Sequence, residues 1–125
     1  MSRFEGLLIW QRARAMRVMI RDATQAMSDW ELKDQMRSAA LSVMSNIAEG
    51  SERSTDADFR RFLAMAHGSC GELRSQLIVA LEDRWVDQPS YDRLNGQIIE
   101  VGKMIAGFMK ALARGGGGSR VPTAS

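Results

Sequence analysis

The chain has 125 residues, of which 45% are hydrophobic and 26% charged, and its formal net charge is +2. This composition is ordinary for one globular domain with its own core, and it argues against a nucleic-acid binder that is basic throughout. One cysteine and one histidine exclude an internal disulfide and the usual Cys/His zinc site, and no apolar run approaches the roughly 20 residues that span a bilayer.

These numbers predict a cytoplasmic protein without metal, cofactor or membrane partner. The lone Cys70 fits a reducing compartment, and the N-terminus lacks the plain apolar block of a signal peptide.

The first predicted helix covers residues 4–27. Its core stripe has spacings of four and three residues and consists of Ile9, Ala13, Met16, Ile20, Ala23 and Met27. Further apolar residues lie beside this stripe, at Leu8, Ala15, Met19 and Ala26. Arg12 falls within the apolar arc, so it needs a carboxylate such as Glu49 or Glu72 across a helix or subunit boundary.

The other side of this helix is basic. Spacings of four, three and four place on one face Trp10, Arg14, Arg17 and Arg21. Such a row predicts an RNA contact, in which guanidinium groups hold phosphates and the indole stacks on a base. The alternative is a solvated charged face on which Trp10 anchors a helix or subunit contact.

The second predicted helix covers residues 30–49. Ser28 stands three residues before Glu31, which is the spacing of a capping box. The core stripe contains Leu32, Met36, Ala40, Val43 and Ile47. Gly50 follows as a typical residue just after a helix C-terminus.

The third predicted helix covers residues 56–84, with Thr55 as its N-cap and two aspartates in its first turn. Its stripe contains Phe59, Leu63, Ala66, Cys70, Leu73, Leu77 and Ala80. Residues 50–55 therefore end one helix and cap the next. His67 beside Cys70 suggests nucleophilic chemistry, but a packed thiol and a boundary imidazole are the better interpretation.

The fourth predicted helix covers residues 89–114, with Pro89 in its first turn and a glycine-rich flexible tail at 115–125. Its stripe contains Leu94, Ile98, Val101, Ile105, Phe108 and Leu112. Four long helices with short connections predict an all-α, antiparallel up-down-up-down bundle over residues 1–114. The surplus apolar surface predicts an interface between subunits, and the alternative is a wide core with some ordinary exposed apolar residues.

Glycines interrupt the third and fourth helices at residues 68, 71, 96, 102 and 107. Each costs about 1 kcal/mol relative to alanine, which predicts close approach of a neighbouring helix or subunit; the alternative is a ligand pocket. Glu49 lies in the last turn of the second helix, where the helix dipole disfavours a carboxylate, so we expect Arg53 or another nearby arginine to offset it.

Residues 39–73, "AALSVMSNIAEGSERSTDADFRRFLAMAHGSCGEL", resemble the signature of the 23S rRNA-intervening-sequence proteins, which are also called four helix bundle proteins. The matching positions include Asn46, Glu49, Gly50, Arg53, Phe59, Phe62, Gly68, Ser69 and Glu72. The resemblance extends in length and pattern over residues 4–114.

The resemblance implies a bacterial, cytoplasmic bundle that forms a homopentameric ring and has no known catalytic activity. Some relatives are encoded within insertions in large-subunit ribosomal RNA genes, and a similar protein is the basic accessory factor of diversity-generating retroelements, which works with a reverse transcriptase and RNA.

We therefore expect a non-enzymatic, ring-forming scaffold that binds RNA or a nucleoprotein through the arginine row. One alternative is a purely protein-binding or structural oligomer, and another is an enzyme that uses Glu49 or His67.

Overall fold

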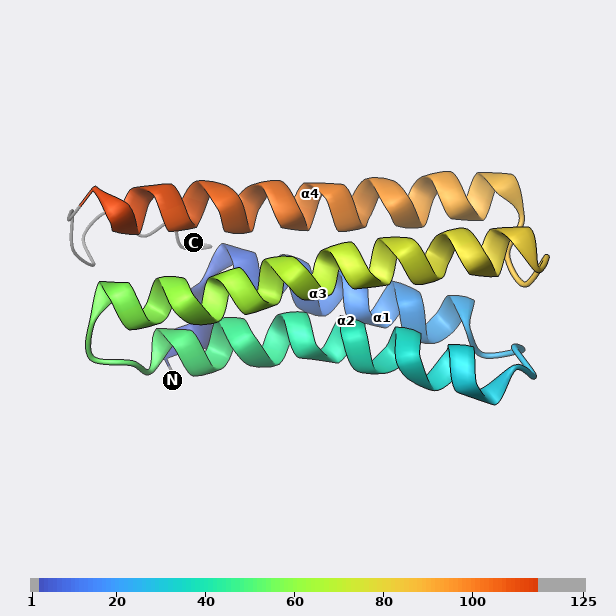
Figure 1. Ribbon diagram of the computed structural model, residues 1–125, viewed down its shortest axis with the longest axis horizontal. Helices are drawn as coiled ribbons and strands as arrows, with labels where there is room; N and C mark the ends of the chain where they lie inside the picture. The colour runs from blue at the N-terminus through green and yellow to red at the C-terminus, as the bar shows by residue number, and fades with distance from the viewer. Residues whose placement is uncertain (1–2, 115–125) are drawn as a thin grey trace.

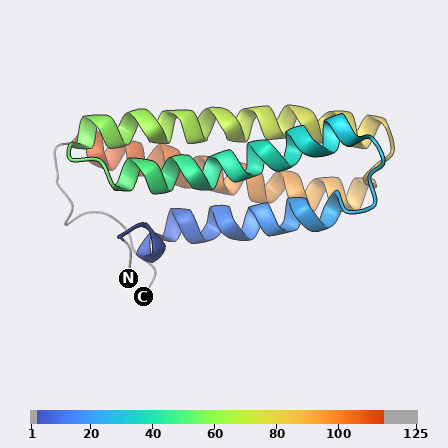
Figure 2. The same ribbon diagram turned by 90° about the horizontal axis from the view of Figure 1, so that it is seen from below.

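The computed structural model describes residues 3–114, which form an antiparallel bundle of four long helices with no β-strand in that range (Figure 1). The elements are a 3₁₀ turn η1 (Arg3–Gly6), α1 (Leu8–Ala23), α2 (Trp30–Ser51), α3 (Asp56–Glu82) and α4 (Gln88–Ala113). α2 packs on α1 and α3. α4 also packs on α1 and α3, on the side opposite α2 (Figures 1 and 2). The expected all-α four-helix bundle is confirmed. The tail expected at 115–125 lies outside the described residues.

The four predicted apolar stripes meet in one hydrophobic core. Its fully buried side chains include Met16, Ile20, Met36, Ile47, Leu63, Leu73, Ile98 and Ile105. Phe59 and Phe108 contact each other near one end of this core, with ring centroids 5.2 Å apart. Because every helix contributes one continuous stripe, burial of these side chains accounts for the side-by-side, antiparallel packing of the four helices.

The helix expected over residues 4–27 is shorter at both ends in the structure, because α1 begins at Leu8, after the η1 turn, and ends at Ala23. The Thr24 hydroxyl donates to the Ile20 carbonyl at 2.8 Å. Arg37 of α2 donates from Nε to Thr24 Oγ1 and from Nη2 to the Arg21 carbonyl, both at 2.9 Å. Hydrogen bonds from α2 thus satisfy groups at the last turn of α1, and the chain can turn there.

Of the two N-caps predicted from the sequence, the one for α2 is wrong and the one for α3 is confirmed. Asp29, and not Ser28, is the N-cap, since its carboxylate accepts from the Leu32 amide at 3.0 Å. Thr55 caps α3 by accepting from the Asp58 amide at 3.1 Å, as expected. α4 begins one residue before Pro89, and Asp87 caps it.

Candidate functional site

The basic face of α1 is present, but Trp10 is not a free indole. Its ring meets the Phe4 ring edge-on, with centroids 5.0 Å apart, and packs against the hydrophobic core. The side chain is therefore half-buried and anchored within its own chain. This arrangement limits its ability to stack on a base.

The arginines of this face differ in their partners. Arg21 pairs with Asp22, with 3.1 Å between Nη2 and Oδ1. Arg14 is exposed and Arg17 half-buried, and neither forms an ion pair with any residue between 4 and 114. Arg14 and Arg17 are therefore the two cations of this row whose charge is available to an outside anion.

An apolar strip on α2 borders the arginine row. Arg37 reaches α1 through its bond to the Arg21 carbonyl, so its flank of α2 faces α1. Spacings of four, three and four continue this flank through Leu41, Met44 and Ala48. Leu41 is 49% exposed. The outer surface shared by α1 and α2 thus combines unpaired guanidinium groups with apolar side chains.

The residues of the family signature gather where α2 meets α3. Asn46 donates from Nδ2 to the Ser42 carbonyl at 2.9 Å and to Ser42 Oγ at 3.0 Å. Ser42 Oγ in turn lies 2.9 Å from Ser69 Oγ on α3. This chain of side chains fixes α2 against α3. Ser42 was not singled out in the sequence, although it stands one helical turn before Asn46.

A charged cluster closes the same corner. Glu49 pairs with Arg53 across 3.3 Å, as its position in the last turn of α2 predicts. Arg53 also lies 3.7 Å from Asp58, and its guanidinium carbon is 4.5 Å from the centre of the Phe62 ring. Arg61 approaches the same ring at 4.6 Å. Glu49 therefore balances an arginine that covers an aromatic ring.

Gly50 lies within α2 and not beyond its end, because the helix continues to Ser51. A Cβ atom at this position would stand 2.8 Å from Phe59 Cδ1 and 2.9 Å from Phe62 Cβ. Both distances are far below van der Waals contact. Gly50 is required by the closeness of α3, and the prediction that it ends the helix is wrong.

For two other signature residues, Gly68 and Glu72, and for Arg12 of α1, the structure reveals no role within the described part of the single chain. A Cβ atom at Gly68 would meet nothing within 4 Å, so no neighbouring helix of the chain requires this glycine. Glu72 is exposed, and half-buried Arg12 forms no ion pair with Glu49, Glu72 or another described carboxylate. A pairing of Arg12 across subunits stays a prediction.

The expectation of a packed thiol agrees with the burial of Cys70. Removal from water disfavours the thiolate and raises the pKa of Cys70 from 9.0 to about 11. His67, by contrast, is exposed. The thiol is therefore shielded from water while the imidazole is accessible, although both residues line one hollow between α3 and α4.

The raised pKa of Cys70 predicts a loss of stability in alkali. The unfolded thiol ionises from about pH 9 while the folded thiol stays protonated to about pH 11, so the free energy of unfolding should fall across this window. Urea unfolding at pH 8 and pH 10 measures the fall, and Cys70→Ala should show a smaller one. Equal falls in both proteins would contradict the assignment.

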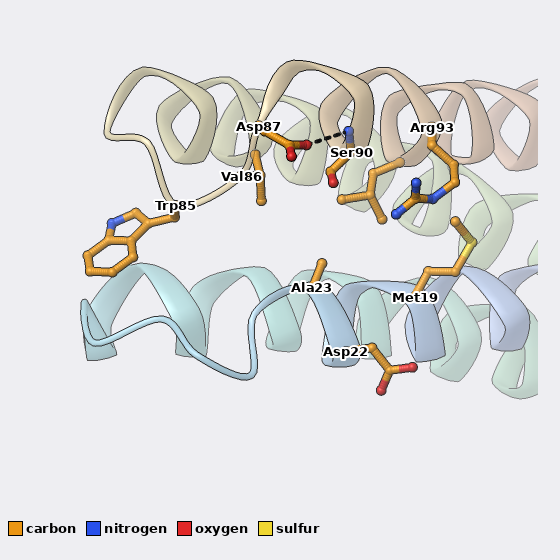
Figure 3. A pocket seen from close by; sticks show the side chains of 9 residues that line it. Met19, Asp22, Ala23, Trp85, Val86, Asp87, Ser90 and Arg93 are labelled. Carbon is orange, nitrogen blue, oxygen red and sulfur yellow. Dashed lines mark hydrogen bonds between the residues drawn. The ribbon is translucent and has the colours of Figure 1, made fainter.

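A hollow of about 420 Å³ lies between α1 and the start of α4 (Figure 3). Met19, Ala23 and Leu94 supply apolar walls. Asp22, which points away from the hollow in Figure 3, is paired with Arg21. Asp87 accepts a hydrogen bond from the Ser90 amide at 2.9 Å, and its pKa is lowered by hydrogen bonding to Ser90, first to the side chain and then to this amide. Both carboxylates of the lining are thus engaged in contacts within the chain.

Two negative findings concern only residues 3–114. No helix in this range is long and apolar enough to cross a membrane. Nor do its His, Cys, Asp and Glu side chains gather in threes or more where they could hold a metal ion.

The helix packing and the α2–α3 contacts define a small antiparallel four-helix bundle protein. The chain belongs to the 23S rRNA-intervening sequence protein family, whose model matches residues 5–107. The resemblance noted in the sequence is therefore confirmed, while the link to retroelement accessory factors stays a prediction.

The bundle is also similar to a solved structure. A crystal structure of a protein of unknown function, from the S23 ribosomal protein family of Bacteroides thetaiotaomicron, superposes with a TM-score of 0.78. The two sequences are 18% identical, and the match covers 82% of this chain and 99% of the other. This likeness establishes the fold only. No curated protein matches the sequence.

Proposed function

We propose that the protein is a non-enzymatic scaffold that binds RNA through the arginine row of α1. The supporting observation is that Arg14 and Arg17 lie on one face without an ion pair among the described residues. Guanidinium groups in this state bind phosphates without first giving up a carboxylate. Trp10 supports the face through its anchored ring, and phosphate contact supplies the affinity.

Assembly of the chain into a pentameric ring belongs to the same proposal. Two free arginines per chain give weak binding, but a ring presents them once per subunit, and linked weak contacts add strongly. Exposed Leu41 beside the row provides apolar surface for contact with RNA bases or with a neighbouring subunit.

The salt dependence of RNA binding tests this proposal. Anisotropy of a labelled single-stranded RNA, titrated at several salt concentrations, should give a steep linear fall of log K with log salt. Arg14→Gln with Arg17→Gln should reduce the magnitude of this slope by about 1.4 per chain engaged, since each single-strand contact contributes about 0.7.

The matched control is Lys103→Gln with Lys110→Gln, which removes the same charge from exposed positions on α4. It should leave the slope close to that of the wild type. Absence of binding at low salt, or equal effects of the two double variants, would refute the RNA proposal.

A purely protein-binding or structural oligomer is the second candidate. It is favoured by large exposed apolar side chains outside the arginine row, Met65 at 41% and Val79 at 39% exposure, both on α3. Light scattering that gives a mass above one chain, together with no RNA binding, would select this candidate.

A further inference from the structure

The outer surface between α3 and α4 is a groove that the proposed RNA contact does not use. Two adjoining hollows of about 240 and 360 Å³ form it and share His67 and Ala106. We call it the α3–α4 groove; its lining includes His67, Gly71 and Arg74 on α3 and Ile99, Ala106 and Met109 on α4. From Ala64 to Arg74 it extends about 15 Å, at 1.5 Å per helical residue.

The floor of the groove is apolar and open. Ile99 and Met109 are half-buried, and small side chains separate them. A Cβ atom at Gly71 would meet nothing within 4 Å, and one at Gly102 would meet only His67 Nε2, at 4.0 Å. Packing within the chain therefore requires neither glycine, and their absent side chains leave room for an approaching helix.

The rim of the groove is positively charged without compensation. Arg74, Lys103 and Lys110 are all exposed members of the lining. None of the described residues that line the two hollows is acidic, and none of these three cations forms an ion pair within residues 4–114. Within the described residues, Arg74 donates a hydrogen bond only to Asn95 Oδ1, at 3.3 Å. An occupant must bring carboxylates or other anions to these positions.

The shape and chemistry of the groove favour a helix over RNA. A helix packs in a furrow between two others when small residues let the axes approach to about 8–10 Å. Recognition of single-stranded RNA relies on aromatic rings or guanidinium planes on which bases stack, and the described lining offers only His67 and Arg74 for this, without Phe, Tyr or Trp. Apolar floor and basic rim together match the two faces of an acidic amphipathic helix.

We propose that the α3–α4 groove docks an acidic amphipathic helix of a partner protein. Its apolar stripe packs on Ile99 and Met109, and its flanking carboxylates pair with Arg74, Lys103 and Lys110. About three turns of the partner fill the groove. This contact lies on the side of the bundle away from the arginine row, so it does not depend on the RNA proposal.

A synthetic peptide of about 18 residues tests the groove directly. It carries leucine at every third or fourth position and glutamate on the flanks. Fluorescence anisotropy should detect binding at low salt, and a peptide of the same composition without the leucine periodicity should bind at least about tenfold more weakly. Lys103→Glu with Lys110→Glu should weaken the periodic peptide about tenfold, whereas Arg14→Glu with Arg17→Glu should leave its affinity within about twofold.

Two glycine variants on α3 test whether the shape of the groove, apart from its charge, contributes to peptide affinity. Gly71→Leu fills the floor of the groove, while Gly68→Leu places the same side chain outside it; at both positions a Cβ atom has free space. Only Gly71→Leu should weaken the peptide, again about tenfold, and circular dichroism confirms that both variants fold.

The proposal would be overturned by no peptide binding, by equal loss in the two leucine variants, or by an effect of Gly71→Leu on RNA affinity alone. If Gly71→Leu instead dissociates an assembly of the chain without affecting the peptide, the groove holds a second copy and the partner-helix proposal is wrong. Only one kind of result would also contradict the RNA proposal, namely a loss of RNA affinity that occurs in the groove variants and not in the arginine-row variants.

Discussion

Gly50→Val should lower the free energy of unfolding by about 3 kcal/mol. Even a Cβ atom at this position would collide with Phe59 Cδ1 at 2.8 Å and Phe62 Cβ at 2.9 Å. The Phe62 atom is bound directly to the α3 backbone, so α3 itself must move to admit it. Overpacking of a filled site costs typically 1–3 kcal/mol, and a branched side chain adds two methyl groups to the collision. Urea unfolding measures the difference.

Gly68→Val is the matched control on α3, since a Cβ atom there meets nothing within 4 Å. Its effect should stay within about 0.5 kcal/mol of the wild type, because surface substitutions rarely exceed that value. If the two valine variants were equally stable, the steric account of Gly50 would be wrong. Phe59→Leu combined with Gly50→Ala should be less damaging than the sum of the single changes, because the shorter side chain vacates the contact.

Arg37→Met should lower the free energy of unfolding by about 2 kcal/mol. The guanidinium donates to Thr24 Oγ1, to the Arg21 carbonyl and, at 3.3 Å, to Gln25 Oε1. Methionine keeps much of the side-chain volume but leaves the end of α1 without these donors. Hydrogen bonds from charged groups contribute about 1.5–3 kcal/mol each when buried, and partial exposure reduces their sum here.

Arg14→Met provides the comparison, because Arg14 is exposed and lacks an ion pair within the described residues. Its effect on stability should be below about 0.5 kcal/mol. Amide hydrogen exchange should show faster opening of the last turn of α1 in Arg37→Met only. Unchanged exchange there would mean that Arg37 does not hold that turn.

The bundle could be predicted from sequence because every helix carries a long apolar stripe of one period. Met36, Leu63 and Ile98 are all fully buried, as their spacing predicts. The end of α1 could not be predicted, since it depends on Arg37, thirteen residues after Thr24. Spacing likewise favoured Ser28 as a cap, although Asp29, one residue later, has the stronger side-chain acceptor.

The sequence predicts which residues of a candidate surface share one helix face. It does not predict which residues of other elements they contact. The sequence places Arg14, Arg17 and Arg21 together, yet only the structure separates the paired Arg21 from the other two. The anchoring of Trp10 by Phe4 depends on the η1 turn, which no periodic pattern reveals. The glycines at 71 and 102 were visible as helix interruptions, but their meeting in one groove follows from the α3–α4 register.

Because the four helices alternate in direction, the first turn of α1 and the last turn of α4 lie at the same end of the molecule (Figure 2). A fluorescent domain or immobilisation tag joined after residue 114 would therefore leave from that end. The opposite end, with the α1–α2 and α3–α4 connections, would stay unobstructed. Sensor-chip experiments can thus orient every copy alike, with the lateral faces turned to the flowing solution.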